Sequence, residues 1–369
     1  MQQRKFTHLA NAPQGGGISL IVGTPTAPFT FRPDAAGNGI LANYPLINYN
    51  VTALQTDYTV WPATSWWTNA FVTTTCGNQF LILCQIFYST NTSGVATSSV
   101  LSLDKNGTTA HYSRGVVVDR PETVLSPDGR LSINYPNVPV TFEGLSSDSL
   151  EIMRNAAKAL EYDFDFTWQT TSPIILNWGG TEFYFGDPDM RTVEWSFPSN
   201  KILNGTISFL GSDTMQIDPS NSLVWYDRQV NNGFPQYGWT WFALQFPGSD
   251  IKVTIWEIHA SQDEKSYRRF ATARTRNGTI LMPVEDIIIR ETWKSEKSGF
   301  VYGTAFTIKF GNGDVLEVKS IRDDQEIGPG KGNSIYEGFA HGEGEFLGQK
   351  ELFGLVEQLI LGSQPVEQS

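Results

Sequence analysis

The feature that most constrains this chain is a series of short aromatic-rich segments in which apolar and polar residues alternate, separated by clusters of Gly, Asn and Pro. Alternation with a period of two is typical of β-strands that bury one face, and Gly and Pro mark the turns between them. Phe, Trp and Tyr make up 13% of the residues, whereas charged residues make up only 17%. The pattern therefore predicts an all-β protein.

A chain of 369 residues is longer than one ordinary hydrophobic core supports, so we expect two domains. The loop Gly186 to Met190 is rich in turn-forming residues and predicts the boundary. Residues 1–190 are expected to form a β-sandwich. From Glu194 onward the alternation is sharper and its spacing is typical of a meandering barrel, which predicts a barrel domain over residues 191–369.

The charge of the chain excludes several classes of partner. A formal net charge of -12 and an isoelectric point near 4.8 disfavour nucleic acid, because phosphate binding needs clustered Lys and Arg. The longest apolar runs are too short for a membrane span. The first residues, Met1 to Gly17, lack the apolar core of a signal peptide.

Cysteines and glycosylation sequons bear on the compartment. Cys76 and Cys84 can close a disulfide across a hairpin or remain thiols, and the sequence leaves both alternatives open. Five Asn-x-Ser/Thr sequons occur beside turn-like residues, at Asn50, Asn91, Asn106, Asn204 and Asn277. They predict a glycoprotein of the secretory pathway whose leader has been removed, with a cytoplasmic protein as the alternative.

The motif inventory favours a small apolar ligand and no cofactor. The four histidines, at positions 8, 111, 259 and 341, are isolated from other metal-ligating residues, so no metal site is expected. The chain lacks a phosphate-binding Gly-rich loop and a G-x-S-x-G nucleophile motif. The few polar residues set among aromatics are typical of a pocket for a mostly neutral ligand.

Three aromatic stretches carry the most information. In Ser65 to Ala70, adjacent Trp66 and Trp67 must point to opposite faces of a strand. In Trp225 to Gln229, Asp227 shares a face with both end residues, and Tyr226 and Arg228 face the other way. An inward Asp is costly unless it is paired, so Asp227 is either a functional acid or the partner of a nearby cation.

The third stretch, Gly238 to Gln245, places Trp239 and Trp241 on one face. That face is predicted to form an apolar wall. Core packing is the simpler explanation of these two indoles, and direct contact with a ligand is the functional one.

These stretches, followed by Trp293-Lys-Ser-Glu-Lys-Ser-Gly, Asp324-Gln-Glu and Tyr336-Glu-Gly, resemble the carotenoid hydratase and AttH-like superfamily. The resemblance spans most of residues 60–360. It implies a β-sandwich followed by a lipocalin-like barrel, with ligand bound between them. Fungal members include lipocalin-like Diels–Alderases, of the decalin-forming type and of the hetero type that joins a tropolone quinone methide to humulene, and the sequons favour the latter.

The resemblance also implies candidate residues from both halves. Of the predicted substrate-binding residues, the resemblance points to Trp67, Gln85, Trp225 and Tyr336, and the aromatic stretches themselves add Asn69, Tyr226, Trp239 and Trp241. Asp227 and Trp195 match acid-chemistry positions of the hydratases, but Val193 stands where those enzymes carry a His. Ser65 likewise replaces a Glu that decalin-forming members place before the Trp pair.

We therefore predict a cofactor-independent pericyclase of secondary metabolism that acts on a small hydrophobic polyketide or terpenoid. Such an enzyme needs a shaped pocket and a hydrogen-bond donor instead of a nucleophile. If water must first leave a hydroxymethyl precursor, Asp227 is the predicted general acid, with Glu337 second and Trp195 as the third catalytic candidate. The alternatives are a decalin-forming Diels–Alderase, a terpenoid hydratase or isomerase, and a carrier without catalysis.

Overall fold

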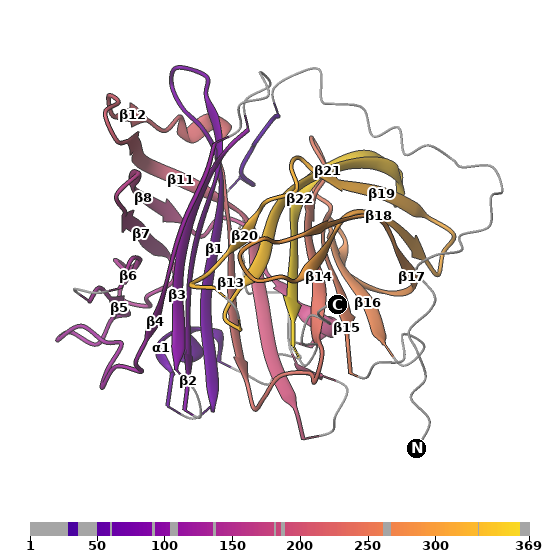
Figure 1. The fold of residues 1–369 in the computed structure, drawn as a ribbon, viewed down its shortest axis with the longest axis horizontal. Coiled ribbons are helices and arrows are strands. Elements are labelled where there is room, and N and C mark those ends of the chain that lie inside the picture. Colours follow the sequence, from indigo (N-terminus) through magenta and orange to yellow (C-terminus); the bar gives the residue numbers. More distant parts are fainter. Residues whose placement is uncertain are drawn as a thin grey trace.

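The computed structural model describes residues 29–35, 50–59, 61–90, 93–103, 110–135, 138–180, 182–185, 189–260, 267–330 and 332–361 (Figure 1). Almost all regular structure in these residues is β-strand, and the strands fall into two sheets. The predicted all-β class is confirmed. The exceptions are the one-turn helix α1 (Val51–Thr56) and two short 3-10 turns, η1 (Asn177–Gly179) and η2 (Pro219–Asn221).

The first sheet has the strand order β4-β3-β2-β1-β13-β11-β8-β7-β6-β5, with β9, β10 and β12 added along β11. Its strands are β1 (Ala63–Thr73), β2 (Gln79–Ser89), β3 (Gly94–Ser102), β4 (His111–Val118), β5 (Ser132–Ile133), β6 (Thr141–Gly144), β7 (Ile152–Lys158), β8 (Tyr162–Gln169), β9 (Ile175–Leu176), β10 (Glu182–Tyr184), β11 (Arg191–Phe209), β12 (Met215–Gln216) and β13 (Leu223–Asn231).

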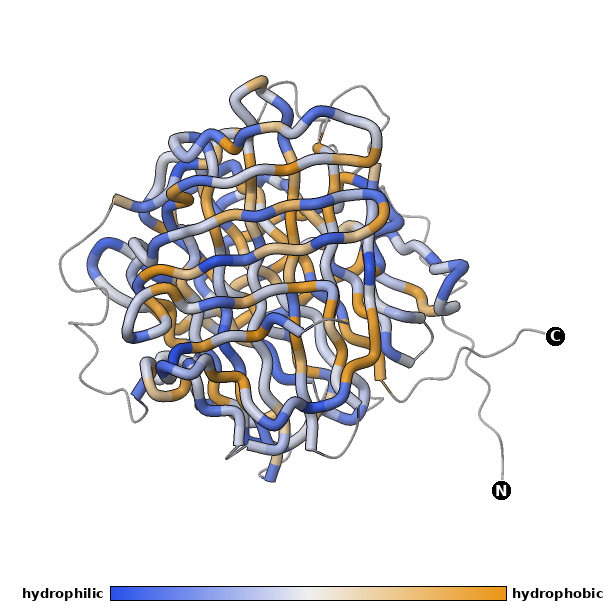
Figure 2. The backbone as a smooth tube through the Cα atoms, turned by 90° about the vertical axis from the view of Figure 1, so that its left-hand side faces the viewer, coloured by the Kyte–Doolittle hydropathy of each residue, from blue (hydrophilic) through white to orange (hydrophobic). Residues whose placement is uncertain are grey.

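This sheet curves back on itself, so that one continuous sheet provides the two layers of the predicted sandwich. Figure 2 shows strands of one layer crossing those of the layer behind. A large apolar core lies between the layers and includes Trp66, Phe166 and Trp195. The hydroxyls of Ser98 on β3 and Tyr162 on β8 meet across it at 2.8 Å.

The second sheet closes into a barrel because β19 pairs with β21. Its strands are β14 (Gly238–Gln245), β15 (Lys252–Ile258), β16 (Arg268–Thr275), β17 (Gly278–Lys294), β18 (Val301–Phe310), β19 (Val315–Ser320), β20 (Glu326–Ile327), β21 (Ile335–Phe346) and β22 (Gln349–Ile360). Side chains such as Phe242, Phe306 and Tyr336 fill the barrel interior with a core of its own.

The two sheets divide the chain later than the sequence predicts. Strands β11 and β13 follow the predicted boundary at residues 190 and 191, yet both pair within the first sheet. The change of sheet falls between Asn231 and Gly238. Residues 191–231 were predicted in the barrel because their alternation resembles that of the barrel strands, and alternation does not reveal a strand's partners.

A third apolar cluster joins the outer face of the barrel to the first sheet. Trp67 and Phe71 of β1 meet Trp239 and Trp241 of β14 in it, and Phe31 of the segment 29–35 packs at its edge. The indole rings of Trp67 and Trp241 are in edge contact, with centroids 5.6 Å apart. The interface between the two sheets therefore contains a hydrophobic cluster of its own.

Several smaller sequence expectations can be compared with the structure. Cys76 and Cys84 are both free thiols. Three of the sequon asparagines, Asn50, Asn204 and Asn277, are exposed, and the other two lie outside the described residues. Among the residues described, no helix is long and apolar enough to cross a membrane.

Candidate functional site

Cross-strand register assembles one wall of the candidate site on the first sheet. Residues paired across antiparallel strands point to the same face, so a row of partners forms a continuous surface. One such row runs Ser196, Asp227, Trp67, Gln85 and Thr97 over β11, β13, β1, β2 and β3. The next row on that face runs Glu194, Gln229, Ser65, Phe87 and Val95 over the same strands.

The barrel supplies the opposite wall by the same principle. Trp256, Trp241, Glu357 and Glu337 are successive partners across β15, β14, β22 and β21. Trp241 contacts Trp256 at a ring centroid distance of 6.2 Å. These side chains point out of the barrel and toward the first sheet, because alternation directs their neighbours Phe242 and Val356 into the barrel core.

A cavity of about 220 Å³ lies between the two walls. It is lined by Ser65, Trp67, Gln85, Phe87, Val95, Thr97, Glu194, Asp227, Gln229, Phe234, Trp239, Trp241, Trp256, Gly332, Asn333, Ser334, Ile335, Glu357, Leu359 and Leu361. Most of this lining is apolar or aromatic, and the charged groups in it are all carboxyls. A mostly apolar pocket with a few convergent polar groups is the usual form of a small-molecule site.

Asp227 is buried in this pocket without a cationic partner. Its Oδ1 accepts a hydrogen bond of 2.9 Å from the Trp225 indole N–H. Burial raises the pKa of Asp227 to about 8, while the neighbouring Ser196 hydroxyl and the Trp225 indole oppose the rise and the Glu357 carboxyl adds to it. The group is therefore mostly protonated at neutral pH and can donate a proton.

The alternative role of Asp227 as an ion-pair partner does not fit the structure. Arg228 points to the other face of β13, where its guanidinium stacks on Trp66 at 4.0 Å and donates to the backbone carbonyls of Asp57 and Ser65. The ion pairs of the described residues do not include Asp227.

Glu194 has a different environment from Asp227. Its two carboxyl oxygens accept hydrogen bonds from side-chain amides, one from Asn177 at 2.7 Å and one from Gln229 at 2.9 Å. Burial and the nearby Asp227 carboxyl raise the pKa of Glu194, whereas the Gln229 amide lowers it. The amide donors on both oxygens favour the anionic form and oppose this rise, but the net pKa of Glu194 stays above its usual value, so Glu194 can act as a general base only when it is ionised.

Glu337 and Glu357 complete a group of four buried carboxyls. Oε1 of Glu337 accepts a hydrogen bond from the Trp67 indole at 3.1 Å, and Oε1 of Glu357 accepts one from Trp239 at 2.6 Å. Burial is the main cause that raises the pKa of both groups, and the Glu357 carboxyl raises that of Glu337 further. Such a concentration of perturbed carboxyls in one pocket is typical of an active site.

The structure brings together many of the residues predicted from the sequence. Five of them line the cavity: Trp67, Gln85, Asp227, Trp239 and Trp241. Glu337 does not line the cavity but accepts a hydrogen bond from Trp67, which does, and the Trp225 indole donates to Asp227 on the same strand. Trp239 and Trp241 pack in the apolar cluster between the sheets and also line the cavity, and their contact with a ligand stays a prediction.

Four other candidates lie away from the cavity, which corrects the expectation that they share it. Trp195 and Tyr226 point into the core of the first sheet, where the Tyr226 hydroxyl donates to Gln55 at 2.8 Å. Tyr336 points into the barrel core. Asn69 shares the face of Trp67 but is fully buried beyond the cavity lining. In the first three cases, strand alternation directs the side chain to the opposite face.

Sequence reasoning missed Glu194, Glu357 and Trp256. Glu194 adjoins Trp195, so the candidate position was displaced by one residue and hence to the wrong face. Glu357 interrupts the apolar run Leu352 to Leu359, and a carboxyl at a buried position of such a run is the signal that identifies it.

Comparisons with known proteins find chains of similar sequence. No family model matches the chain. The chain is 29% identical over 298 residues to kievitone hydratase of Fusarium solani subsp. phaseoli, covering 79% of this chain and 81% of that one. It is 28% identical over 354 residues to dehydratase asqC of Emericella nidulans, covering 91% and 94%.

Solved structures extend the similarity to the fold. The crystal structure of kievitone hydratase from Nectria haematococca superposes with a TM-score of 0.77 at 26% identity, covering 90% of this chain and 98% of that one. An AttH-like protein from Nitrosomonas europaea gives a TM-score of 0.68 at 18% identity over 82% and 94%, and at that identity the likeness concerns the fold.

Proposed function

The chain belongs to the carotenoid hydratase and AttH-like superfamily of lipocalin-like proteins, and from that premise we propose that it is an enzyme that removes water from, or adds water to, a small hydrophobic metabolite. The observation that carries this proposal is a cluster of four buried carboxyls at one aromatic pocket, three of which line it while the fourth, Glu337, pairs with Glu357 beside it. Carboxyls of different environment are the means by which proteins perform acid and base chemistry together.

In the proposed elimination, Asp227 gives its proton to the leaving hydroxyl of the substrate. The carbon–oxygen bond breaks with its electron pair going to oxygen, and water departs. Glu194 takes the compensating proton from an O–H or C–H of the substrate, so that the products are water and an unsaturated ligand. Hydration is the reverse of the same steps. The raised pKa of Asp227 suits the acid. The pKa of Glu194 is raised as well, and what distinguishes Glu194 as the proposed base is the pair of amide donors that stabilise its ionised form.

A second proposal follows from the aromatic walls. Trp239 and Trp256, with ring centroids 5.8 Å apart, and Phe234, 5.9 Å from Trp239, can hold a planar unsaturated ligand away from water. Each such contact contributes about 0.5 to 1.5 kcal/mol beyond burial. If dehydration gives a quinone methide, the pocket can then align it with an alkene for a hetero-Diels–Alder reaction, which is the finer reaction that we predict for this chain.

The experiment that tests both proposals uses purified protein and two probes. Kievitone tests addition of water. A hydroxymethyl tropolone, supplied with and without humulene, tests loss of water and cycloaddition. Products are separated on a chiral column, identified by mass spectrometry and compared with those of a protein-free reaction.

Water gained or lost above the control supports the acid–base proposal, and one enriched adduct stereoisomer supports the cycloaddition as well. If both probes give only as much product as the protein-free reaction and either one binds tightly, catalysis is contradicted. The remaining function is that of a carrier.

A further inference from the structure

Two of the four carboxyls face each other directly. Glu337 and Glu357 are register partners on the adjacent strands β21 and β22, and both side chains are buried. Two carboxylates in that position repel each other, since like charges directly opposite destabilise an antiparallel pair and burial strengthens the repulsion.

The surroundings do not neutralise the pair with a cation. The charged groups that face it from the first sheet are Asp227 on β13 and Glu194 on β11, and both are acids. The neutral donors are the indoles of Trp67 and Trp239, each of which occupies one oxygen of one carboxyl. Within the described residues, then, the pair is compensated by hydrogen bonds and not by charge.

One oxygen of the pair lacks a conventional donor. Oε2 of Glu337 is buried and receives no N–H or O–H from another side chain or the backbone of the described residues, whereas the Glu357 carboxyl lies within hydrogen-bonding reach. A buried oxygen without a donor is costly, and a proton between the two carboxyls satisfies it. A proton held between Glu337 and Glu357 is therefore favoured both by the missing donor and by the proximity of the two carboxyls.

We propose that Glu337 and Glu357 share a single proton and form a proton-exchange pair that restores Asp227 after each turnover. This proposal rests on the proposed acid–base function. Elimination leaves Asp227 without its proton and Glu194 with an extra one. The pair can pass its shared proton to Asp227 and take the proton of Glu194, which restores all four groups with no net change.

Infrared spectroscopy of the full chain without ligand tests the shared proton independently of any activity. The carbonyl stretch of a protonated carboxylic acid is separate from the bands of carboxylates and amides. At neutral pH, we expect Glu337→Gln, Glu357→Gln and the double variant to lose the same band area, that of one protonated acid. The loss is equal because the remaining carboxylate accepts the new amide N–H in place of the proton.

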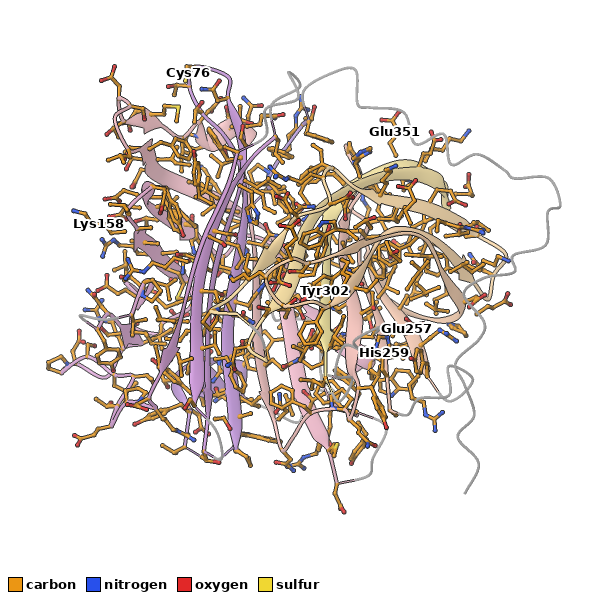
Figure 3. The ribbon with its side chains drawn as sticks, viewed as in Figure 1. Cys76, Lys158, Glu257, His259, Tyr302 and Glu351 are labelled. Carbon is orange, nitrogen blue, oxygen red and sulfur yellow. The ribbon has the colours of Figure 1, made fainter. Side chains whose placement is uncertain are left out.

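The same two strands provide the control. Glu343 and Glu351 are also register partners on β21 and β22, but they are exposed, and Glu351 lies on the outer surface of the barrel (Figure 3). Glu351→Gln is expected to leave the acid band unchanged. If neither buried single variant loses area from the acid band, both carboxyls are ionised in the unsubstituted protein and the proposal is overturned. A double variant that loses twice the area of a single variant also overturns it.

Trp67→Phe provides a second variant in case a Gln variant fails to fold. The indole N–H of Trp67 favours the anionic form of Glu337, so its removal is expected to move the loss of the acid band to higher pH. An unchanged titration contradicts the pairing.

The exchange role has its own readout. We expect Glu357→Gln to lower kcat by about tenfold to a hundredfold with little change in KM, below the full loss expected for a direct general acid. Unchanged turnover contradicts the exchange role. If the acid band behaves as expected and the unsubstituted protein catalyses no transfer of water, the proposed function fails while the shared proton stands.

Discussion

At the scale of single residues, the chemistry of this protein depends on where four carboxyls sit and what each can bond to. Asp227 has one indole donor and no cation, and Glu194 has two amide donors. Groups of the same chemical type thus acquire different proton affinities from their surroundings. Burial raises the pKa of both groups, and the proposed division into acid and base rests on the additional donors that stabilise the ionised form of Glu194.

The pH dependence of turnover follows from Asp227. A general acid must carry its proton, and burial raises the pKa of this group to about 8. We expect turnover to be maintained at neutral pH and to fall as the pH rises through about 8. A pH–rate profile checks this, with Glu351→Gln, which replaces an exposed carboxyl on β22, as the control. An alkaline limb that persists unchanged in a partly active Asp227 variant contradicts the assignment.

Removal of the Asp227 carboxyl should separate activity from stability. Asp227→Asn cannot donate a proton, so we expect turnover to fall by about a hundredfold or more. The folded pKa lies above the unfolded value of about 3.9, so the free energy of unfolding of the wild type falls as the pH rises from about 4 to about 8. The Asp227→Asn variant has no ionisable group at this position, so it lacks this pH-dependent fall in the free energy of unfolding.

Denaturant unfolding of both proteins near pH 4 and near pH 8 measures this effect. The variant should gain stability relative to the wild type at the higher pH only. A wild type whose stability rises over this interval relative to the variant would show that the Asp227 pKa is lowered and not raised.

At the scale of strands and turns, one side of the cavity, here called its roof, is formed by the turn between β20 and β21 and depends on a close backbone contact. The turn between β20 and β21 supplies Gly332, Asn333 and Ser334 to the cavity lining. The start of this turn lies against β4, where a Cβ at Gly115 would come within 2.6 Å of the Gly328 backbone. Only glycine at position 115 allows this approach.

We expect Gly115→Ala to displace the turn. Overpacking of this kind costs about 1 to 3 kcal/mol, and the displaced roof should raise KM more than it lowers kcat. Gly180→Ala is the matched control, because a Cβ there meets nothing within 4 Å. Equal KM values for the two variants would show that the roof does not contribute to binding.

Sequence predicts the faces of strands better than it predicts their partners. The opposite directions of Trp66 and Trp67, and of Asp227 and Arg228, follow from the two-residue period and are confirmed. The pairing of β11 and β13 with the first sheet is a long-range choice that leaves no local signal. Glu357 does leave a local signal, as a carboxyl within an apolar run, but its role depends on a partner on another strand.

At the scale of the whole molecule, a buried ion pair ties the amino-terminal segment to the barrel. Arg274 on β16 donates to Asp34 at 2.7 Å and to Ser172, in the loop before β9, at 2.7 Å. The Arg274 side chain is 4% exposed, so loss of its partner leaves a buried cation without a counter-ion. The pair therefore holds three distant parts of the chain together.

Asp34→Asn should accordingly lower the free energy of unfolding by about 3 kcal/mol. Asp250→Asn breaks a pair with Arg276 that is largely exposed, and such pairs are worth at most about 1 kcal/mol. Denaturant unfolding of both variants tests the comparison. Similar losses from the two substitutions would mean that the Asp34 pair is not a structural tie.

The overall charge of the site predicts which ligands it accepts. The charged residues that line the cavity are acids, so an anionic ligand meets repulsion without a compensating cation in the described residues. We expect naphthol to bind about tenfold or more tightly than naphthoate at neutral pH, as measured by quenching of tryptophan fluorescence. Tighter binding of the anion would contradict the electrostatic picture of the site.

The most direct test of the central claim, that the carboxyl cluster moves water on and off the ligand, is isotope exchange. A hydroxymethyl tropolone is incubated without humulene in water enriched in heavy oxygen. The label in the recovered alcohol is measured by mass spectrometry. The unsubstituted protein should introduce the label faster than the protein-free control, and Asp227→Asn should introduce it at the control rate. Equal labelling with the unsubstituted protein, the variant and no protein would contradict the account.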